Sequence, residues 1–245
     1  MERYPKRLNR CPLVEVTFEI RFVSTLPEDA IFGIVYQALE PIIQKTKPIS
    51  LPITNLPAEV RKTDPNLKFQ PHYQIQINNW VIAIGPRTLL FSNRESYVGW
   101  DEYKAFILSA FDLLFKAKII KHINRTGLRY INVFNGSLFK DAKVKVQIGN
   151  DFLSIEETAI HTTIKTHDAY NICLQLNNNV LIGISNQPPK KSSLIDIDVF
   201  QEESIASEVF QSKISEIMEK SHTLEKKKFF NLLTSEFIKE LEPIF

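Results

Sequence analysis

Residues 78–134 read NNWVIAIGPRTLLFSNRESYVGWDEYKAFILSAFDLLFKAKIIKHINRTGLRYINVF, and the rest of the chain is organised around this stretch. An apolar run at 81–84 ends at Gly85 and Pro86, and a second run at 88–92 follows directly. Glycine tolerates a positive φ and proline presets the geometry of a turn. The two runs are therefore predicted to be adjacent strands.

The segment after the second run is predicted to form a long amphipathic helix. Asp101 and Glu102 open it, since acidic side chains complement the positive end of a helix. Apolar residues then recur with the spacing i, i+3, i+4, i+7 from Tyr103 to Phe115. They give the helix one wide apolar face over about four turns.

A third strand is predicted at 125–134. Its two faces carry different sets: Leu128, Tyr130, Asn132 and Phe134 on one, Arg129, Ile131 and Val133 on the other. If the Arg129 face is buried, its guanidinium needs a carboxylate or carbonyl partner. Two interpretations stay open for Arg129: an ion pair with an acid at the edge of the core, or contact with an anion or a protein partner.

Four further elements are expected before this stretch. Alternation of apolar and polar residues predicts a strand at 13–23, and a stripe of apolar residues predicts a helix that begins at Pro27. The proline-rich region 46–71 is predicted to be mostly loop, with a short strand near 58–62. Residues 73–77 alternate again and predict another strand.

The second half of the chain contains a partial echo of the first. Residues 172–176 and 180–184 are predicted to form a hairpin, with a turn at 177–179, that resembles the segment around 75–82. A duplication is one interpretation and the repetitive nature of hairpins is the other. The related halves would be 11–135 and 140–245.

The fold expected from these elements is α+β, a single domain over 1–245. Antiparallel β-meanders are each backed by a helix. A further strand is predicted at 160–164 and another at 194–200. A C-terminal helical pair is expected from about residue 204 onward, with a break between the two helices at 221–223.

Composition narrows the class of protein. The chain has 245 residues, 44% of them hydrophobic, and a formal net charge of +2, which is too small to indicate nucleic-acid binding by itself. The two cysteines, Cys11 and Cys173, favour neither a disulfide framework nor a structural zinc site. No apolar leader and no apolar run long enough to span a bilayer is present, so we expect a cytoplasmic protein without membrane contact.

A basic arm occupies residues 1–10, with Arg3, Lys6, Arg7 and Arg10 against the single acid Glu2. Such an arm binds phosphate backbones in some proteins, but a solvated, poorly ordered terminus is the commoner case. Together with the segment from Lys116 to Arg129, it defines an alternative function as an RNA- or DNA-binding protein.

Three segments, PLVEVTFEIRF near the start, LLFSNRESYVGWDEYK in the middle and GLRYINVF after the helix, resemble the landmarks of a known family. It is a sporadically distributed bacterial family of uncharacterised proteins of similar length. The later segments IDIDVF and SHTLEKKKFFNLLT are similar to its C-terminal landmarks, so the resemblance covers almost the whole chain. It implies one family unit and an association with mobile or defence-type genes, and it brings no activity, cofactor or catalytic residue.

The loop that carries Arg94, Tyr97 and Trp100 is the segment with the composition of an interaction site. Arginine, tyrosine and tryptophan are the residue types that contribute most binding energy at interfaces. Arg125 and Arg129 on the following strand are further candidates for contact. The alternative is that Tyr97 and Trp100 fold back over the start of the helix as a hydrophobic staple.

Asp196 and Asp198 are the candidates for metal chemistry. At positions i and i+2 of a strand their carboxylates leave the same face, close enough to share a divalent cation. A lone acidic pair is weak evidence for a metal site. The favoured interpretation is a polar strand face beside basic side chains such as Arg125 or Arg129, and no metal or cofactor is expected.

The function that we expect is a non-enzymatic binding protein of the bacterial cytoplasm. It would act through a protein partner or as a homo-oligomer. The alternatives are a metal-dependent phosphoryl-transfer enzyme centred on Asp196 and Asp198, and the nucleic-acid binder described above.

Overall fold

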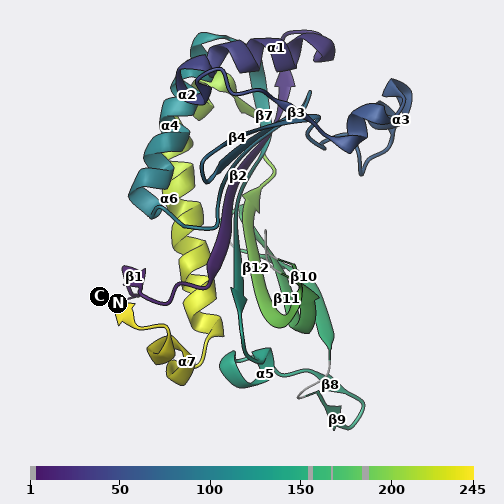
Figure 1. The fold of residues 1–245 in the computed structure, drawn as a ribbon. Helices are drawn as coiled ribbons and strands as arrows, with labels where there is room; N and C mark the ends of the chain where they lie inside the picture. Colours follow the sequence, from purple (N-terminus) through teal and green to yellow (C-terminus); the bar gives the residue numbers. More distant parts are fainter. Residues whose placement is uncertain (1–3, 154–156, 167, 184–187) are drawn as a thin grey trace. The chain divides into compact units, whose positions relative to one another are not determined.

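The computed structural model describes residues 4–153, 157–166, 168–183 and 188–245 (Figure 1). The chain packs into two compact units, and each is assembled from separate stretches of the sequence. Unit 1 comprises 1–14, 129–199 and 221–245, and unit 2 comprises 15–128 and 200–220. The predicted halves 11–135 and 140–245 each contribute residues to both units.

Unit 2 contains an antiparallel sheet with helices. Its elements are β2 (Leu13–Ser24, from Glu15 onward), α1 (Glu28–Ala38), α2 (Glu40–Ile43), β3 (Ile49–Ser50), the 3-10 helix η1 (Pro52–Asn55), α3 (Ala58–Thr63), β4 (Tyr73–Ile77), β5 (Trp80–Ile84), β6 (Thr88–Arg94), α4 (Trp100–Lys116), the first part of β7 (Ile120–Phe134), β13 (Ile205–Ala206) and the start of α6 (Ser207–Leu232). The strand order is β7-β2-β6-β5-β4-β3, and β13 pairs with β7. The register from β2 to β4 is antiparallel throughout.

Aromatic packing holds α4 against the sheet of unit 2. The ring of Phe111 on α4 lies 6.0 Å from Phe18 on β2 and 5.8 Å from Phe210 on α6. At the other end of α4, Phe106 stacks on Trp80 of β5 at 3.7 Å. The apolar face expected from the helical spacing is thus the face that is buried.

Unit 1 contains the other sheet segment and the chain ends. Its elements are β1 (Arg7–Leu8), the second part of β7, α5 (Leu138–Asp141), β8 (Gln147–Ile148), β9 (Asp151–Phe152), β10 (Thr158–Lys165), β11 (Asn171–Ile182), β12 (Lys190–Gln201, up to Val199), the end of α6, α7 (Ser235–Glu240) and β14 (Pro243–Ile244). The order of the main strands is β10-β11-β12-β7, and β8 pairs with β9.

The core of unit 1 forms where the end of α6 and α7 pack on one sheet face. Leu174 on β11, Ile197 on β12 and Phe229 on α6 belong to one buried cluster. Phe134 on β7 adds a ring contact with Phe237 on α7 at 4.9 Å. The structure therefore confirms an α+β protein with an antiparallel sheet and a C-terminal helical pair, α6 and α7.

The prediction for residues 58–62 is wrong. The expected short strand at 58–62 is helix α3, which Pro57 precedes and whose charges suit the helix dipole, with Glu59 in the first turn and Arg61 in the last. Val60 is the one β-branched residue in 58–62, so the strand prediction had little support.

The turn expected at 177–179 lies inside β11, whose pairing with β10 continues through Asn177 and Asn178. The Asn178 side chain is buried and accepts a hydrogen bond from the backbone of Leu138 at 2.9 Å, so it serves the start of α5. The predicted hairpin partner ends at Ile184, which lies outside the described residues. The similarity between the two halves is therefore weaker, because the predicted turn lies inside a continuous strand. The duplication stays a prediction.

The break expected at 221–223 is absent, because α6 is continuous from Ser207 to Leu232. Tertiary contacts occupy the residues that the sequence marked as a break. Ser221 is buried, and Nδ1 of His222 lies 2.9 Å from the hydroxyl of Tyr130 on β7. These contacts offset the modest helix propensity of serine, histidine and threonine.

The described part of the N-terminal arm pairs with the C-terminus. β1 is antiparallel to β14, and Arg10 forms an ion pair with Glu242 at 2.9 Å. Tyr4 stacks on Phe230 at 5.8 Å. Arg3 lies outside the described residues. The expectation of a poorly ordered arm is therefore wrong from Tyr4 onward.

Candidate functional site

Arg94 ends β6 and is paired within its own sheet. Its Nε lies 2.9 Å from a carboxylate oxygen of Glu15 on β2, directly opposite in the register. The side chain is 46% exposed, so the pair is a surface ion pair. Such pairs contribute little to stability and leave the guanidinium accessible.

Tyr97 and Trp100 lie beside Tyr103, the buried residue of the first turn of α4. Their rings are 6.5 and 6.3 Å from the Tyr103 ring. The indole Nε1 of Trp100 also donates to the carboxylate of Glu219 on α6 at 3.1 Å, and Lys104 binds the same carboxylate at 2.6 Å. This packing of the rings over the first turn of α4 is what the staple interpretation predicts. Contact of this loop with a partner stays a prediction.

Arg125 is buried inside unit 2. It forms an ion pair with Glu19 on β2, and its guanidinium lies 4.6 Å from the centre of the Phe200 ring. Glu19 also accepts from Nε of Arg21 at 2.8 Å. A side chain with these contacts serves packing of the sheet, so the predicted interaction role of Arg125 requires that a partner reach a buried group.

Arg129 on β7 and Asp196 on β12 form a two-bond ion pair. Nε of Arg129 donates to Oδ1 of Asp196 at 2.8 Å, and Nη2 donates to Oδ2. Asp196 is only 3% exposed, and a buried carboxylate requires such a partner. The pairing of this acid with a basic side chain is the interpretation that the sequence favoured, and it engages both oxygens that a metal would need.

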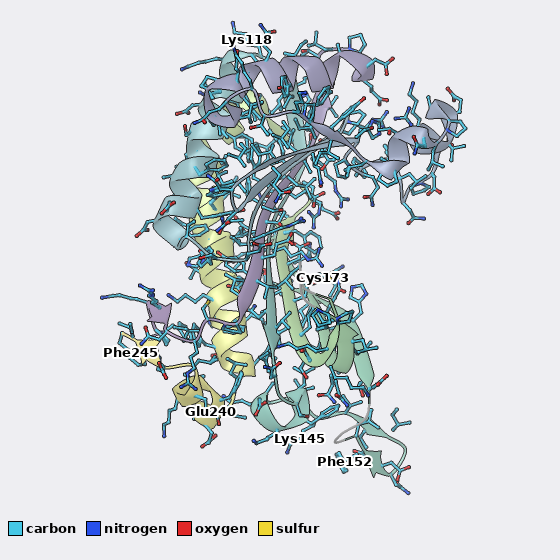
Figure 2. All side chains as sticks on the ribbon, viewed as in Figure 1. Lys118, Lys145, Phe152, Cys173, Glu240 and Phe245 are labelled. Atoms are coloured by element: carbon cyan, nitrogen blue, oxygen red, sulfur yellow. The ribbon has the colours of Figure 1, made fainter. Side chains whose placement is uncertain are left out.

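Cys173 and His161 lie on the sheet face opposite the core of unit 1. Cys173 (labelled in Figure 2) lies between the core residues Ile172 and Leu174 in the sequence. Its sulfur is 3.1 Å from Nε2 of His161. Burial, followed by the charges of Asp198 and Asp196, raises the pKa of the Cys173 thiol. A thiol that stays protonated at neutral pH is a poor nucleophile, so the pair does not have the chemistry of an activated cysteine.

Strand β10 is the edge strand of unit 1. It pairs with β11 over eight consecutive residues without a bulge, and no other strand of the described chain pairs with it. Its sequence TAIHTTIK is rich in β-branched residues, has no proline and has a single full charge, Lys165. Most of its side chains are exposed. An edge of this kind is a template for a further strand, because proteins usually protect edges with prolines, bulges or several charges.

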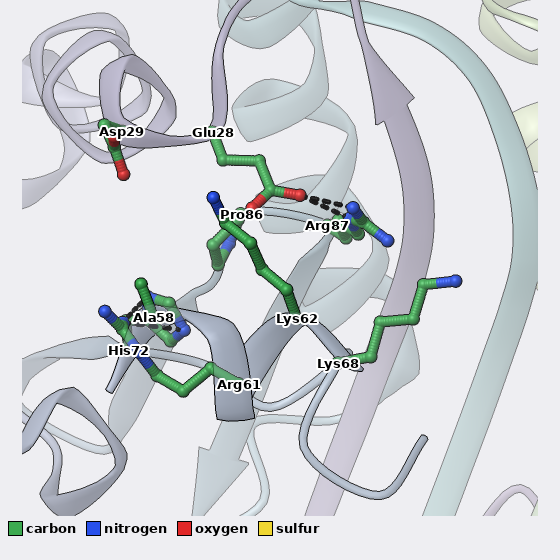
Figure 3. Close-up of a pocket in the computed structure, with 9 residues that line it drawn as sticks. All are labelled: Glu28, Asp29, Ala58, Arg61, Lys62, Lys68, His72, Pro86 and Arg87. Atoms are coloured by element: carbon green, nitrogen blue, oxygen red, sulfur yellow. Dashed lines mark hydrogen bonds and ion pairs between the residues drawn. The ribbon is translucent and has the colours of Figure 1, made fainter. Parts of the chain in front are cut away.

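A charged pocket in unit 2 was not predicted from the sequence. It is lined by residues from α1, from α3, from the loop at Lys68, from His72 and the start of β4, and from the end of β5 with the turn after it (Figure 3). Arg61 and His72 are in contact inside it. No local motif unites these residues, since they come from five separate segments, and the segment with Arg61 was itself assigned to the wrong element.

None of the helices in the described part of the chain has the length and hydropathy to cross a bilayer. The fold places the chain among α+β proteins with an antiparallel sheet. A scan against protein-family models gave no match, and a search of curated proteins gave none either.

Proposed function

We propose that the chain is a non-enzymatic binding protein of the bacterial cytoplasm, acting through a protein partner or through self-association. The observation that carries this proposal is the regular, exposed edge of β10. Addition of a strand to such an edge supplies main-chain hydrogen bonds for affinity, and the side chains that alternate along it supply specificity. The family resemblance brings neither an activity nor a partner.

The charges at the two ends of β10 favour β10 of a second copy of the chain as the strand that is added to this edge. In an antiparallel pair centred on His161, residue i of one copy lies opposite residue 322 − i of the other. This register places Glu157 of each copy opposite Lys165 of its partner. Opposite charges directly across two strands stabilise the pair. Glu157 already contacts Lys191 at 2.7 Å, but this pair is highly exposed and exchanges at little cost.

Sedimentation velocity over a concentration series tests the self-association. We expect a monomer–dimer equilibrium that Lys165→Glu weakens, because it places like charges at both ends of the paired strands. The double variant Glu157→Lys/Lys165→Glu reverses both charges and should restore the dimer. Lys190→Glu makes the same charge change on an exposed lysine of β12 and serves as the control.

Amide hydrogen exchange locates the contact. In the self-association model, protection of 159–165 rises with protein concentration, since pairing satisfies outward backbone groups. A wild-type chain that stays monomeric throughout, or a dimer in which β10 gains no protection, would contradict this interface. A dimer that the double charge reversal fails to restore would contradict the register.

A further inference from the structure

The pocket of unit 2 consists of two adjoining hollows with shared walls. Glu28, Asp29, Arg61, His72 and Pro86 line both of them. The larger hollow has a cavity volume of about 240 Å³. Pockets for drug-sized ligands have roughly 300–1,000 Å³, so this one limits a ligand to a smaller molecule.

Cations dominate the lining. Arg87 neutralises Glu28, since its Nε and Nη2 lie 2.6 and 2.5 Å from one oxygen of that carboxylate. The remaining cations are Arg61, Lys62 and Lys68, and the remaining acid is the exposed Asp29. Three positive charges against one negative charge leave the pocket with a net charge of 3 − 1 = +2. This balance favours an anion, and a dianion matches it in charge.

Arg61 has a buried donor that nothing in the described chain satisfies. Its Nε is inaccessible to solvent and has no hydrogen-bond partner. In two other arginines of this chain, Nε and Nη2 are the atoms that bind a carboxylate. Arg129 binds Asp196 in this way, and Arg87 binds Glu28. A buried donor without an acceptor costs free energy, so a shift of this side chain that brings Nε to an oxyanion in the pocket would be favourable.

His72 holds the guanidinium of Arg61 in place. Nη1 of Arg61 lies 3.1 Å from Nδ1 and 3.4 Å from Nε2 of His72, and because a guanidinium only donates, the imidazole is the acceptor. Burial and the charge of Arg61 lower the pKa of His72, so the ring is neutral at pH 7 and free to accept. The Nη1 group of Arg61 is thereby used for positioning.

One wall of the larger hollow is apolar. Phe32 on α1 stacks on Tyr73 of β4 at 4.0 Å, and both rings line the hollow together with Ile84. Gly85 also lines the hollow, and a Cβ there would lie 2.7 Å from the carbonyl oxygen of Gln70, so only glycine allows this close approach of the backbone. A ligand that fills this space therefore has an apolar or aromatic body as well as a charged end.

We propose that this pocket binds a phosphate monoester of a small apolar or aromatic alcohol. The phosphate lies beside the guanidinium of Arg61, which lines both hollows, with Lys62 and Lys68 supplying further positive charge. The organic group lies against Phe32 and Tyr73. The site is independent of the β10 interface, because it belongs to the other unit.

Isothermal titration calorimetry at low ionic strength with phenyl phosphate tests the site, with inorganic phosphate and phenol as comparison probes. We expect phenyl phosphate to bind more tightly than inorganic phosphate and phenol not to bind. Arg61→Gln should weaken phenyl phosphate binding about tenfold or more, since it removes a charge-assisted hydrogen bond. Arg61→Lys keeps the charge but not the two-donor edge and should weaken binding too.

Lys45→Gln is the matched control, because Lys45 is a highly exposed lysine of unit 2 that does not line the pocket. It should leave the affinity unchanged. The NMR signals of His72 should shift on titration of the wild type and locate the ligand. Circular dichroism checks that each variant is folded. If Arg61→Gln does not fold, the affinity of Arg61→Lys still tests the role of Arg61.

Three results would overturn the proposal: no binding of phenyl phosphate to the folded wild type, equal affinity in the wild type and both Arg61 variants, or binding without a shift of the His72 signals. Equal affinity for inorganic phosphate would overturn the assignment of the apolar wall. Binding of phenol as tight as that of phenyl phosphate would overturn the role of the phosphate.

Discussion

Arg129 and Asp196 are joined by two parallel hydrogen bonds across the neighbouring strands β7 and β12, with Nε 2.8 Å from Oδ1. The two members of the pair differ in environment: the Arg129 side chain is 44% exposed and the Asp196 side chain 4%. The carboxylate therefore depends on the guanidinium more than the guanidinium depends on the carboxylate.

This asymmetry predicts unequal costs for removing each partner. Arg129→Gln leaves a buried carboxylate without two charged donors and should lower the free energy of unfolding by about 3 kcal/mol. Asp196→Asn keeps the shape and leaves an arginine that water reaches, so about 1 kcal/mol is expected. Urea denaturation at pH 7 measures both, and equal costs would show that the burial of Asp196 does not control the pair.

Divalent metal ions should not stabilise the wild-type chain, since both oxygens of Asp196 are engaged by Arg129. We expect the same melting temperature with and without Mg²⁺ or Mn²⁺ in differential scanning calorimetry. Asp196→Asn/Asp198→Asn should leave dimerisation intact. A metal-dependent rise in melting temperature that the double variant abolishes would support the phosphoryl-transfer alternative, because a ligand that binds the native state raises its stability.

Trp100→Ala should destabilise unit 2 by about 1–3 kcal/mol, because it removes ring contact with Tyr103 and the hydrogen bond to Glu219. Trp100→Phe keeps an aromatic ring and should cost less.

If the loop is also a contact surface, Arg94→Ala, Tyr97→Ala or Trp100→Ala lowers the dimer or partner affinity, by about 2 kcal/mol at a hot spot. Stability loss in all three without any change in association would leave the loop purely structural.

Glu225 predicts a pH dependence of stability. It is buried in α6, and burial raises its pKa from 4.5 to about 8. The folded state therefore binds a proton between these values that the unfolded state has released, so stability falls as pH rises from about 5 to 8. The loss amounts to a few kcal/mol, as each unit of pKa difference corresponds to about 1.4 kcal/mol.

Glu225→Gln removes this titration and should give a flatter profile of unfolding free energy against pH. Glu216→Gln, at an exposed position of the same helix, should follow the wild type. Parallel profiles for the wild type and Glu225→Gln would contradict a buried, protonated carboxyl at this position.

Two glycines predict opposite responses to alanine. A Cβ at Gly136 would lie 2.1 Å from Oδ2 of Asp141, the atom that accepts the backbone N–H of Ser137, so Gly136→Ala should cost about 1–3 kcal/mol. At Gly33 on α1 a Cβ meets nothing within 4 Å, and Gly33→Ala should stabilise by about 0.5–1 kcal/mol. Thermal unfolding of both variants checks the pair, and a loss at Gly33 would show that the α1 surface is not open.

The sequence by itself determined the α+β class and most of its elements. Alternation predicted the strand at 13–23, and helical spacing predicted the helix that Asp101 opens, because both signals arise from one face packing against a core over many residues. The pairing of Asp196 with a basic side chain was also predictable, since a buried carboxylate requires a partner. Short segments were the failures: at 58–62 and 177–179 the local signals were too weak to compete with tertiary contacts.

Only the tertiary structure decided which strand is an edge and which side chains meet in a pocket. The residues of β10 predict a strand, but their edge position depends on the order of pairing, which alternation does not encode. Arg61, His72 and Gly85 are brought together by α3, β4 and a turn that are separate in the sequence. Long-range packing creates both the edge strand and the pocket, so no local sequence motif predicts them.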